Sequence, residues 1–183
     1  MRRIVAGLLI SLDGVVESPT DWGFSQYFND EMREGISAGI AQADAVLLGR
    51  RTYLEFAELW PNQSSDVLMA DFLNNSPKYV VSTTLDTLRW APSRLLAGDL
   101  AEQLTKLKQQ PGKNILIPGS PTLVRSLLGA GLLDELNLNV CPVVVGSGMR
   151  LFDGITHQAR LKLVESRALR TGVLSVTYQP VPA

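Results

Sequence analysis

The sequence predicts one α/β domain with a central mixed, mostly parallel sheet, antiparallel C-terminal strands and helices on its flanks. Apolar runs of strand length alternate with helical patterns over most of the chain. Residues 161–168 and 173–179 then flank Arg170-Thr171-Gly172 as a hairpin, and so short a connection excludes a parallel crossover. No repeat or linker divides the 183 residues, so a single domain is expected over residues 1–183.

The expected strands are apolar runs bounded by polar or turn residues. The first is continuous enough for a central position covered on both faces. The strands expected before the hairpin are residues 4–10, 45–48, 79–81, 114–117 and 135–145. Helices are expected where apolar residues recur at helical spacing or where start signals occur. These helices cover residues 29–42 and 99–110, begin near Thr52 and Pro121, and include a short one at residues 67–73.

The strand at residues 45–48 runs directly into Gly49-Arg50-Arg51-Thr52. Thr52 and Glu55 have the spacing of a capping box, so a helix is expected to begin there. Free backbone N–H groups and the helix dipole favour an anion at such a junction, and two guanidinium groups add forks shaped for phosphate. The junction therefore predicts a phosphate site, with solvated surface charges beside an ordinary helix start as the alternative.

A second junction favours the phosphate site. Gly119 and Ser120 follow another expected strand, with Ser120 at the N-cap position and Pro121 at the first helical position. The strand at residues 79–81 likewise runs into Ser82-Thr83-Thr84, three hydroxyls that can donate to phosphate. Ligands of open α/β sheets lie beyond the carboxyl ends of the strands. The three strand ends therefore predict one extended polyphosphate ligand, most simply a dinucleotide.

Composition excludes several classes of protein. Lys and Arg are scattered and the formal net charge is −1, so neither nucleic acid nor a membrane surface is an expected partner. The apolar runs are of strand length and no signal peptide is recognised, so a cytoplasmic protein is expected. One cysteine and one histidine make neither a disulfide framework nor a zinc site, and no metal is expected. Cys141 is expected to be buried and His157 to be an exposed loop residue without a role.

The chain lacks both a Gly-x-Gly-x-x-Gly fingerprint after its first strand and a Walker-type Gly-Lys-Ser/Thr, which disfavours a Rossmann domain and a P-loop. Six ordered segments carry a likeness to a different family. They are Ser11 to Gly14, Ala43 to Tyr53, Val80 to Ser82, Ile117 to Ser120, Leu132 to Leu136, and Pro142 to Gly148 ahead of Leu151-Phe152. Through this set nearly the whole chain resembles the dihydrofolate reductase-like family. Within it, the chain is most similar to stand-alone bacterial relatives of the reductase domain of the riboflavin-biosynthesis deaminase-reductase.

This resemblance implies a reductase that uses NADPH, and the two arginines favour the phosphorylated cofactor over NADH. In the family, the Gly-Arg-x-Thr stretch and the hydroxyls after the next strand share the phosphates. A glycine pair after a later strand contacts the pyrophosphate, and the first loop borders the nicotinamide. The cofactor-binding residues implied here are Gly14, Gly49, Arg50, Arg51, Thr52, Ser82, Thr83, Gly119, Ser120 and Thr122. A small heterocyclic substrate and a homodimer are also implied.

The sequence identifies no definite proton donor for hydride transfer. The two candidates are Asp13, in the loop after the first strand, and Glu31, on the first helix. An Asx-type turn that holds the loop is the favoured interpretation of Asp13, and an interaction with the helix dipole that of Glu31. Trp22 and Tyr53 are the aromatic residues expected to touch substrate, with core packing as the alternative.

Three functions follow from these observations. The first is an NADPH-dependent reductase of a pteridine- or pyrimidine-type heterocycle, such as 5-amino-6-(5-phosphoribosylamino)uracil. Against that particular substrate, no dense basic cluster is left for its phosphate; Arg150 is the one candidate, and solvation at the surface is the favoured interpretation of that residue. The second is a divergent reductase of another small carbonyl or imine. The third is a nucleotide-binding sensor without chemistry.

Overall fold

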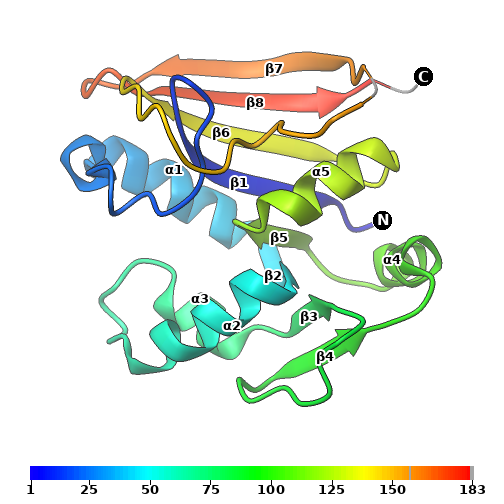
Figure 1. Ribbon diagram of the computed structural model, residues 1–183. Helices are drawn as coiled ribbons and strands as arrows, with labels where there is room; N and C mark the ends of the chain where they lie inside the picture. Colours follow the sequence, from blue (N-terminus) through cyan, green and yellow to red (C-terminus); the bar gives the residue numbers. More distant parts are fainter. Residues whose placement is uncertain (157, 182–183) are drawn as a thin grey trace.

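The computed structural model describes residues 1–156 and 158–181, and it shows one mixed sheet of eight strands flanked by helices (Figure 1). The strand order is β4-β3-β2-β5-β1-β6-β8-β7. The strands are β1 (Ile4–Ser11), β2 (Ala43–Gly49), β3 (Lys78–Val81), β4 (Ser93–Leu96), β5 (Asn114–Pro118), β6 (Glu135–Cys141), β7 (Leu161–Ala168) and β8 (Leu174–Pro180). The helices are α1 (Asp30–Ala41), α2 (Arg50–Leu59), α3 (Ala70–Asn75), α4 (Leu100–Gln109) and α5 (Pro121–Gly129), with 3₁₀ turns at Phe24–Tyr27 and Trp60–Asn62. The predicted mixed sheet flanked by helices is confirmed.

Strand β1 lies inside the parallel part of the sheet, where it pairs with β5 on one side and β6 on the other. β2 joins β5 to β3, and β4 completes that edge, all in parallel. β8 pairs antiparallel with both β6 and β7, so the predicted C-terminal hairpin is confirmed. The continuous apolar run of β1 suits this place, because a strand covered on both faces needs apolar residues at successive positions.

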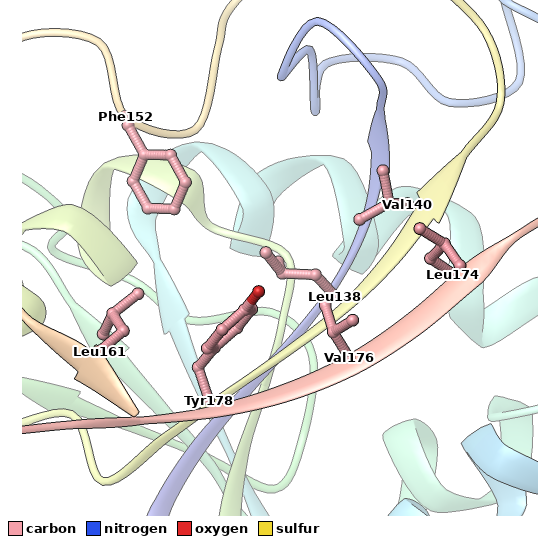
Figure 2. A pocket seen from close by; sticks show the side chains of 7 residues that line it. All are labelled: Leu138, Val140, Phe152, Leu161, Leu174, Val176 and Tyr178. Atoms are coloured by element: carbon pink, nitrogen blue, oxygen red, sulfur yellow. The ribbon is translucent and has the colours of Figure 1, made fainter. Parts of the chain in front are cut away.

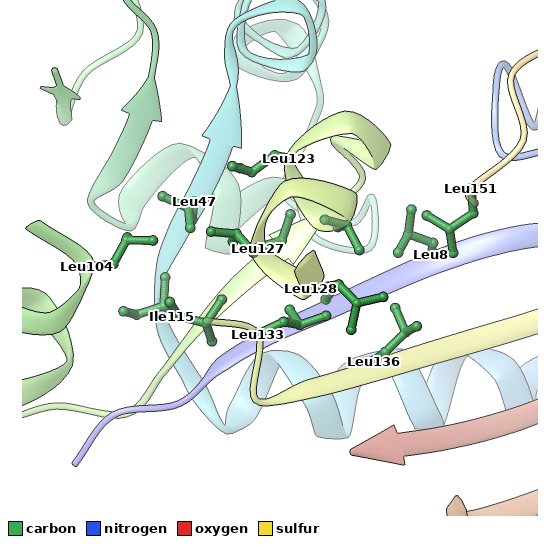
Figure 3. Packing of buried hydrophobic residues seen from close by; sticks show 14 of the residues in the cluster. Leu8, Leu47, Leu104, Ile115, Leu123, Leu127, Leu128, Leu133, Leu136 and Leu151 are labelled. Carbon is green, nitrogen blue, oxygen red and sulfur yellow. The ribbon is translucent and has the colours of Figure 1, made fainter. Parts of the chain in front are cut away.

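Successive residues of β2 point to opposite faces of the sheet and bury into different cores. Leu47 belongs to the largest core, which α4 and α5 cover and which Figure 3 shows around α5. Its neighbour Leu48 packs instead with Tyr53 of α2 and Leu73 of α3. Met32 of α1 belongs to a third cluster, which also contains the buried thiol of Cys141, as the sequence predicted.

A fully buried lysine belongs to the core beside α3. Lys78, the first residue of β3, has no exposed surface, and its Nζ donates to the carbonyl oxygens of Leu73 at 2.7 Å and Ser76 at 3.0 Å. The same nitrogen lies 4.4 Å from the centre of the Trp90 ring. Burial lowers the pKa of Lys78 to about 8. Its ammonium group satisfies carbonyls at the end of α3, so the residue serves the fold.

The predicted capping box is wrong. Helix α2 begins at Arg50, with Gly49 as its N-cap, because β2 runs into the helix without an intervening loop. Thr52 therefore lies inside the first turn, and Glu55 accepts a hydrogen bond from Arg51 rather than from a backbone N–H at the N-cap.

Other boundaries also differ from the predictions. The strand expected at residues 135–145 ends at Cys141, because Pro142 has no N–H and the chain then turns so that Val143 donates to the Cys141 carbonyl at 2.8 Å. The short helix expected at residues 67–73 covers Ala70–Asn75 instead. The sequence did not predict β4, a four-residue edge strand too short to show a periodic pattern. Over the described residues, none of the helices combines the length and the apolar character that a membrane crossing requires.

Candidate functional site

The carboxyl ends of β3, β2 and β5 meet at one edge of the sheet. β2 and β3 are parallel, and Gly49 at the end of β2 is in register with Val81 at the end of β3. Ser82 therefore follows directly beside the start of α2. β5 lies on the other side of β2 and ends at Pro118, after which Gly119 leads into α5. The three strand ends that the sequence singled out thus lie together.

A hydrogen bond joins the starts of α2 and α5. The amide of Gly49 donates to Oγ of Ser120 at 3.0 Å. Ser120 is buried and has a left-handed backbone with φ 55°, which turns its side chain away from its own helix. Gly119 has φ 117°, and a Cβ placed there would lie 3.6 Å from Cγ2 of Thr52. The two helix N-termini are therefore neighbours in close contact.

Among the residues that the structure describes, helices α2 and α5 lack the side-chain caps that α1 and α4 have. The side chains of Asn29 and Asp99 cap α1 and α4 by accepting from amides in the first turn. Within the described residues, no side chain caps α2 or α5. Ser120 stands at the predicted N-cap position of α5, but its hydroxyl binds Gly49 instead. The neighbouring starts of α2 and α5 thus leave first-turn N–H groups without a cap from any described side chain, at the positive ends of two helix dipoles.

The two arginines at the start of α2 have different surroundings. Arg50 is exposed and forms no ion pair within the described part of the chain. Arg51 is held by Glu17, 2.9 Å from its Nη2, and by Glu55, 3.0 Å from its Nε. These hydrogen bonds raise the pKa of Arg51 above its ordinary value. Arg50 is therefore the arginine that is available to an anion.

The hydroxyl residues also differ in availability. Ser82 is buried, and its Oγ accepts from the amides of Thr84 and Leu85, both at 3.1 Å. Its hydroxyl hydrogen is left to donate. Thr83 is exposed. Thr122, in the first turn of α5, accepts from Arg125 at 3.1 Å.

Asp13 fastens the loop after β1 to the turn after β6. Its carboxylate accepts from the amides of Val145 at 3.0 Å and Gly146 at 2.9 Å, and from the hydroxyl of Ser11 at 2.7 Å. These hydrogen bonds hold the pKa of Asp13 far below its ordinary value. The favoured interpretation of Asp13, a residue that holds the loop, agrees with this geometry.

Arg150 completes the same brace. Its Nε donates to the carbonyl of Asp13 at 3.0 Å and its Nη2 to that of Gly146 at 3.1 Å. The guanidinium is therefore committed to the protein rather than directed at a substrate phosphate. Gly14 lies between these contacts with φ 89°, a conformation that favours glycine.

A pocket of about 240 Å³ lies between this loop and this turn. It is lined by Val15, Glu17, Ser18, Asp21, Trp22, Val145, Ser147 and Gly148. The indole Nε1 of Trp22 donates to the carbonyl of Glu17 at 3.1 Å. The Glu17 carboxylate accepts from the amide of Met149 at 3.1 Å, and this bond, followed by that from Arg51, lowers the pKa of Glu17. Trp22 thus lines a pocket, its contact with substrate stays a prediction, and the charged groups among the lining residues are acidic.

A larger groove of about 420 Å³ lies over β6, β8 and β7 (Figure 2). Its lining residues are Leu138, Val140, Phe152, Leu161, Leu174, Val176 and Tyr178. The lining carries no charge, and the Tyr178 hydroxyl is its one side-chain polar group. This groove offers nothing to hold phosphates, so the smaller polar pocket is the better candidate despite its size.

Two predicted site residues lie away from the pocket. Tyr53 is 1% exposed, and its hydroxyl accepts from the amide of Trp90 at 3.0 Å, because α2 turns this side chain into the core. Glu31 accepts from the amide of Arg170 at 2.8 Å and pairs with Arg167. The bond from Arg170 lowers the pKa of Glu31 and ties α1 to the β7–β8 hairpin.

Glu17 is the site residue that the sequence did not reveal. It interacts with Arg51 and Met149, both distant in sequence, and no local pattern marks it. Over the part of the chain that the structure covers, no group of three or more His, Cys, Asp or Glu side chains forms a metal site. His157 lies outside the described residues.

The fold and site define an α/β domain of the dihydrofolate reductase-like fold, with two helix N-termini that no described side chain caps and a small polar pocket. The chain belongs to the RibD C-terminal domain family, whose model matches residues 2–175. Uncharacterized protein YyaP of Bacillus subtilis (strain 168) is 29% identical over 190 residues, which cover 97% of this chain and 94% of YyaP.

Two solved structures show the same fold. A putative riboflavin biosynthesis protein from Shewanella sp. PV-4 has a TM-score of 0.80 and 21% identity, covering 100% of both chains. Dihydrofolate reductase from Enterococcus faecalis, complexed with NADP(H) and RAB-propyl, has a TM-score of 0.58 and 15% identity, covering 97% of this chain and 96% of the reductase. Membership of this family indicates a reductase of the riboflavin-pathway type, while the two solved structures show the fold.

Proposed function

We propose that the chain is an NADPH-dependent reductase of a pteridine- or pyrimidine-type heterocycle, a class that includes 5-amino-6-(5-phosphoribosylamino)uracil. One observation carries the proposal: the uncapped N-termini of α2 and α5 meet at the carboxyl ends of adjacent parallel strands, joined by the bond from Gly49 to Ser120. A pyrophosphate between them accepts from both helices. NADP(H) is bound in the Enterococcus reductase that shares this fold.

The donors of this chain fit the phosphates of such a cofactor. Arg50 supplies a free guanidinium, the Ser82 hydroxyl a hydrogen, and Gly119 lets the ligand approach the backbone. When bound, NADPH supplies a hydride to the carbon of a C=N or C=O bond and leaves as NADP⁺. Trp22 gives the pocket a flat apolar wall against which a heterocycle packs.

Water is the proposed source of the proton that the substrate heteroatom receives. Hydrogen bonds lower the pKa of both Asp13 and Glu17, so both are carboxylates at neutral pH and hold no proton to donate. The same property favours a second candidate function, a nucleotide-binding sensor without chemistry. Consumption of NADPH with a panel of pteridines, pyrimidines, small carbonyls and imines separates the two. A protein that binds NADPH and reduces none of them is the sensor.

The proposal is tested by thermal-shift titration with NADPH and NADH. A ligand at a hundred times its dissociation constant stabilises by about 2.7 kcal/mol, a shift of roughly 5 to 10 °C for a domain of this size. We expect a larger shift with NADPH than with NADH at equal concentration, and loss of the difference in Arg50→Ala. Arg160→Ala is the matched control, an exposed arginine just before β7. No shift with either cofactor rejects the proposal.

A further inference from the structure

The ion pairs of Arg51 make it a poor phosphate ligand. Glu17 and Glu55 each accept from its guanidinium at or below 3.0 Å, so two negative charges already face its one positive charge. A phosphate that approached Arg51 would meet both carboxylates. Arg50 is adjacent in sequence, exposed and outside any ion pair of the described residues. The two arginines that the sequence treated as one pair therefore have separate roles.

Glu17 carries the connection onward from Arg51 to the pocket. One carboxylate oxygen binds Arg51, and the other accepts from the amide of Met149 at 3.1 Å. The Glu17 carbonyl accepts from the indole of Trp22 at 3.1 Å. Glu17 thus links α2, the turn after β6 and the aromatic wall of the pocket. Because its pKa is lowered, the carboxylate stays ionised at neutral pH and the link stays intact.

The link is exposed at one end. The Arg51 side chain is 66% exposed and that of Glu17 34%, and such pairs contribute little to the stability of a fold. The effect of the Arg51–Glu17 ion pair is therefore on geometry. The pair sets the position of the loop from Val15 to Trp22 relative to the start of α2. Loss of the pair should move Trp22 without unfolding the protein.

We infer that Arg51 is a positioning residue: through Glu17 it holds the Trp22 wall of the pocket against the helix end that binds the cofactor, while Arg50 alone supplies the guanidinium that binds phosphate. The part concerning Arg50 rests on the proposed function. The part concerning Arg51, Glu17 and Trp22 does not, because it follows from contacts within this chain.

The positioning role is tested by ¹⁹F NMR of protein labelled with 5-fluorotryptophan. The chain has three tryptophans, and Trp22→Phe assigns the signal of Trp22. We expect Arg51→Ala and Glu17→Gln to move this signal alike, the double variant to move it no further, and Arg51→Lys to restore it in part. Trp60 and Trp90, which lie in the core beside α2 and α3, should keep their signals. An unchanged Trp22 signal in Arg51→Ala overturns the positioning role.

The division between the arginines is tested by titrating NADPH and NADH into the same variants. Arg50→Ala should lower the preference for NADPH about tenfold or more, the effect of losing a charge-assisted hydrogen bond. Arg51→Ala should leave the ratio of the NADPH and NADH affinities within about twofold of wild type. A twofold change corresponds to less free energy than one charge-assisted hydrogen bond contributes. Loss of the preference for NADPH over NADH in Arg51→Ala overturns the division of roles between Arg50 and Arg51. Failure of wild type to bind either cofactor rejects the proposed function and the role of Arg50, while the Trp22 signal still decides the role of Arg51.

Discussion

The amide of Gly49 and Oγ of Ser120 are 71 residues apart in sequence and 3.0 Å apart in the fold. The bond couples the end of β2 to the end of β5, and it removes the hydroxyl of Ser120 from the cap of its own helix. A side chain that capped α5 would compete with an incoming anion for the same N–H groups. The arrangement leaves both helix starts without a side-chain cap from the described part of the chain.

Ser120→Ala tests this coupling. It removes the acceptor of the partly buried Gly49 amide, which should cost about 1 kcal/mol, the lower end of the cost of an unsatisfied buried donor. We expect a loss of this size in the free energy of unfolding by urea, together with weaker NADPH binding. Ser126→Ala, at an exposed position of α5, is the control and should change neither. Unchanged stability in Ser120→Ala would contradict the coupling.

Tyr53→Phe tests whether Tyr53 belongs to the core. The change leaves the buried amide of Trp90 without its hydroxyl partner, at a cost of about 1–3 kcal/mol. The melting temperature should fall by roughly 2–4 °C for each kcal/mol lost, with NADPH affinity unchanged. Weaker cofactor or substrate binding at unaltered stability would instead place Tyr53 in the site.

Lys78 should make the free energy of unfolding depend on pH in the alkaline range. Burial lowers its pKa from 10.5 to about 8, so between these values the unfolded chain binds more protons than the folded one. The contribution of Lys78 to stability therefore rises with pH across this window, by up to about 1.4 kcal/mol per unit. Urea unfolding of wild type and Lys78→Met from pH 7 to 10 measures it as a difference.

Cys141 has the opposite effect on the pH dependence of stability, and the difference between wild type and Lys78→Met cancels it. Burial raises the pKa of that thiol from 9.0 to about 11, so stability falls as the unfolded thiol ionises above pH 9. If wild type and Lys78→Met show parallel pH profiles, Lys78 does not titrate in this window.

The pocket should prefer substrates without a phosphate. Glu17 and Asp21 line it, and its described lining includes no Lys, Arg or His, while Arg150 is committed to backbone carbonyls. With NADPH saturating, we expect 2,4-diaminopyrimidine to bind more tightly than uridine 5′-monophosphate in a calorimetric titration. Asp21→Asn should narrow the difference by reducing repulsion of the phosphate. Tighter binding of the monophosphate would favour the phosphoribosylated substrate.

Local patterns predicted the parts of the fold whose cause is local. The apolar run of β1, the spacing of Met32 on α1 and the hairpin turn at Gly172 each act within a few residues. The predicted capping box failed because the helix begins before Thr52. Thr52 and Glu55 have the spacing of a capping box, but β2 runs directly into α2 and makes Gly49 the N-cap.

The candidate site likewise has features that local sequence predicts and features that depend on contacts between distant residues. The strand ends were predictable because Gly119 and Ser120 have distinctive helix-start chemistry. The ionic partners of Arg51 were not, because Glu17 approaches it from a loop whose path depends on the turn after β6. The homodimer and the physiological substrate stay predictions.

The pairing of β1 also constrains how the chain is made. This strand leaves the ribosome before both of its partners, which begin at Asn114 and Glu135. Until both have emerged, its apolar surface has no permanent neighbours, and contacts so distant in sequence make folding slow. A nascent or truncated chain that stops before Cys141 therefore lacks part of the β6 partner of β1 and leaves apolar residues of β1 without their native cover.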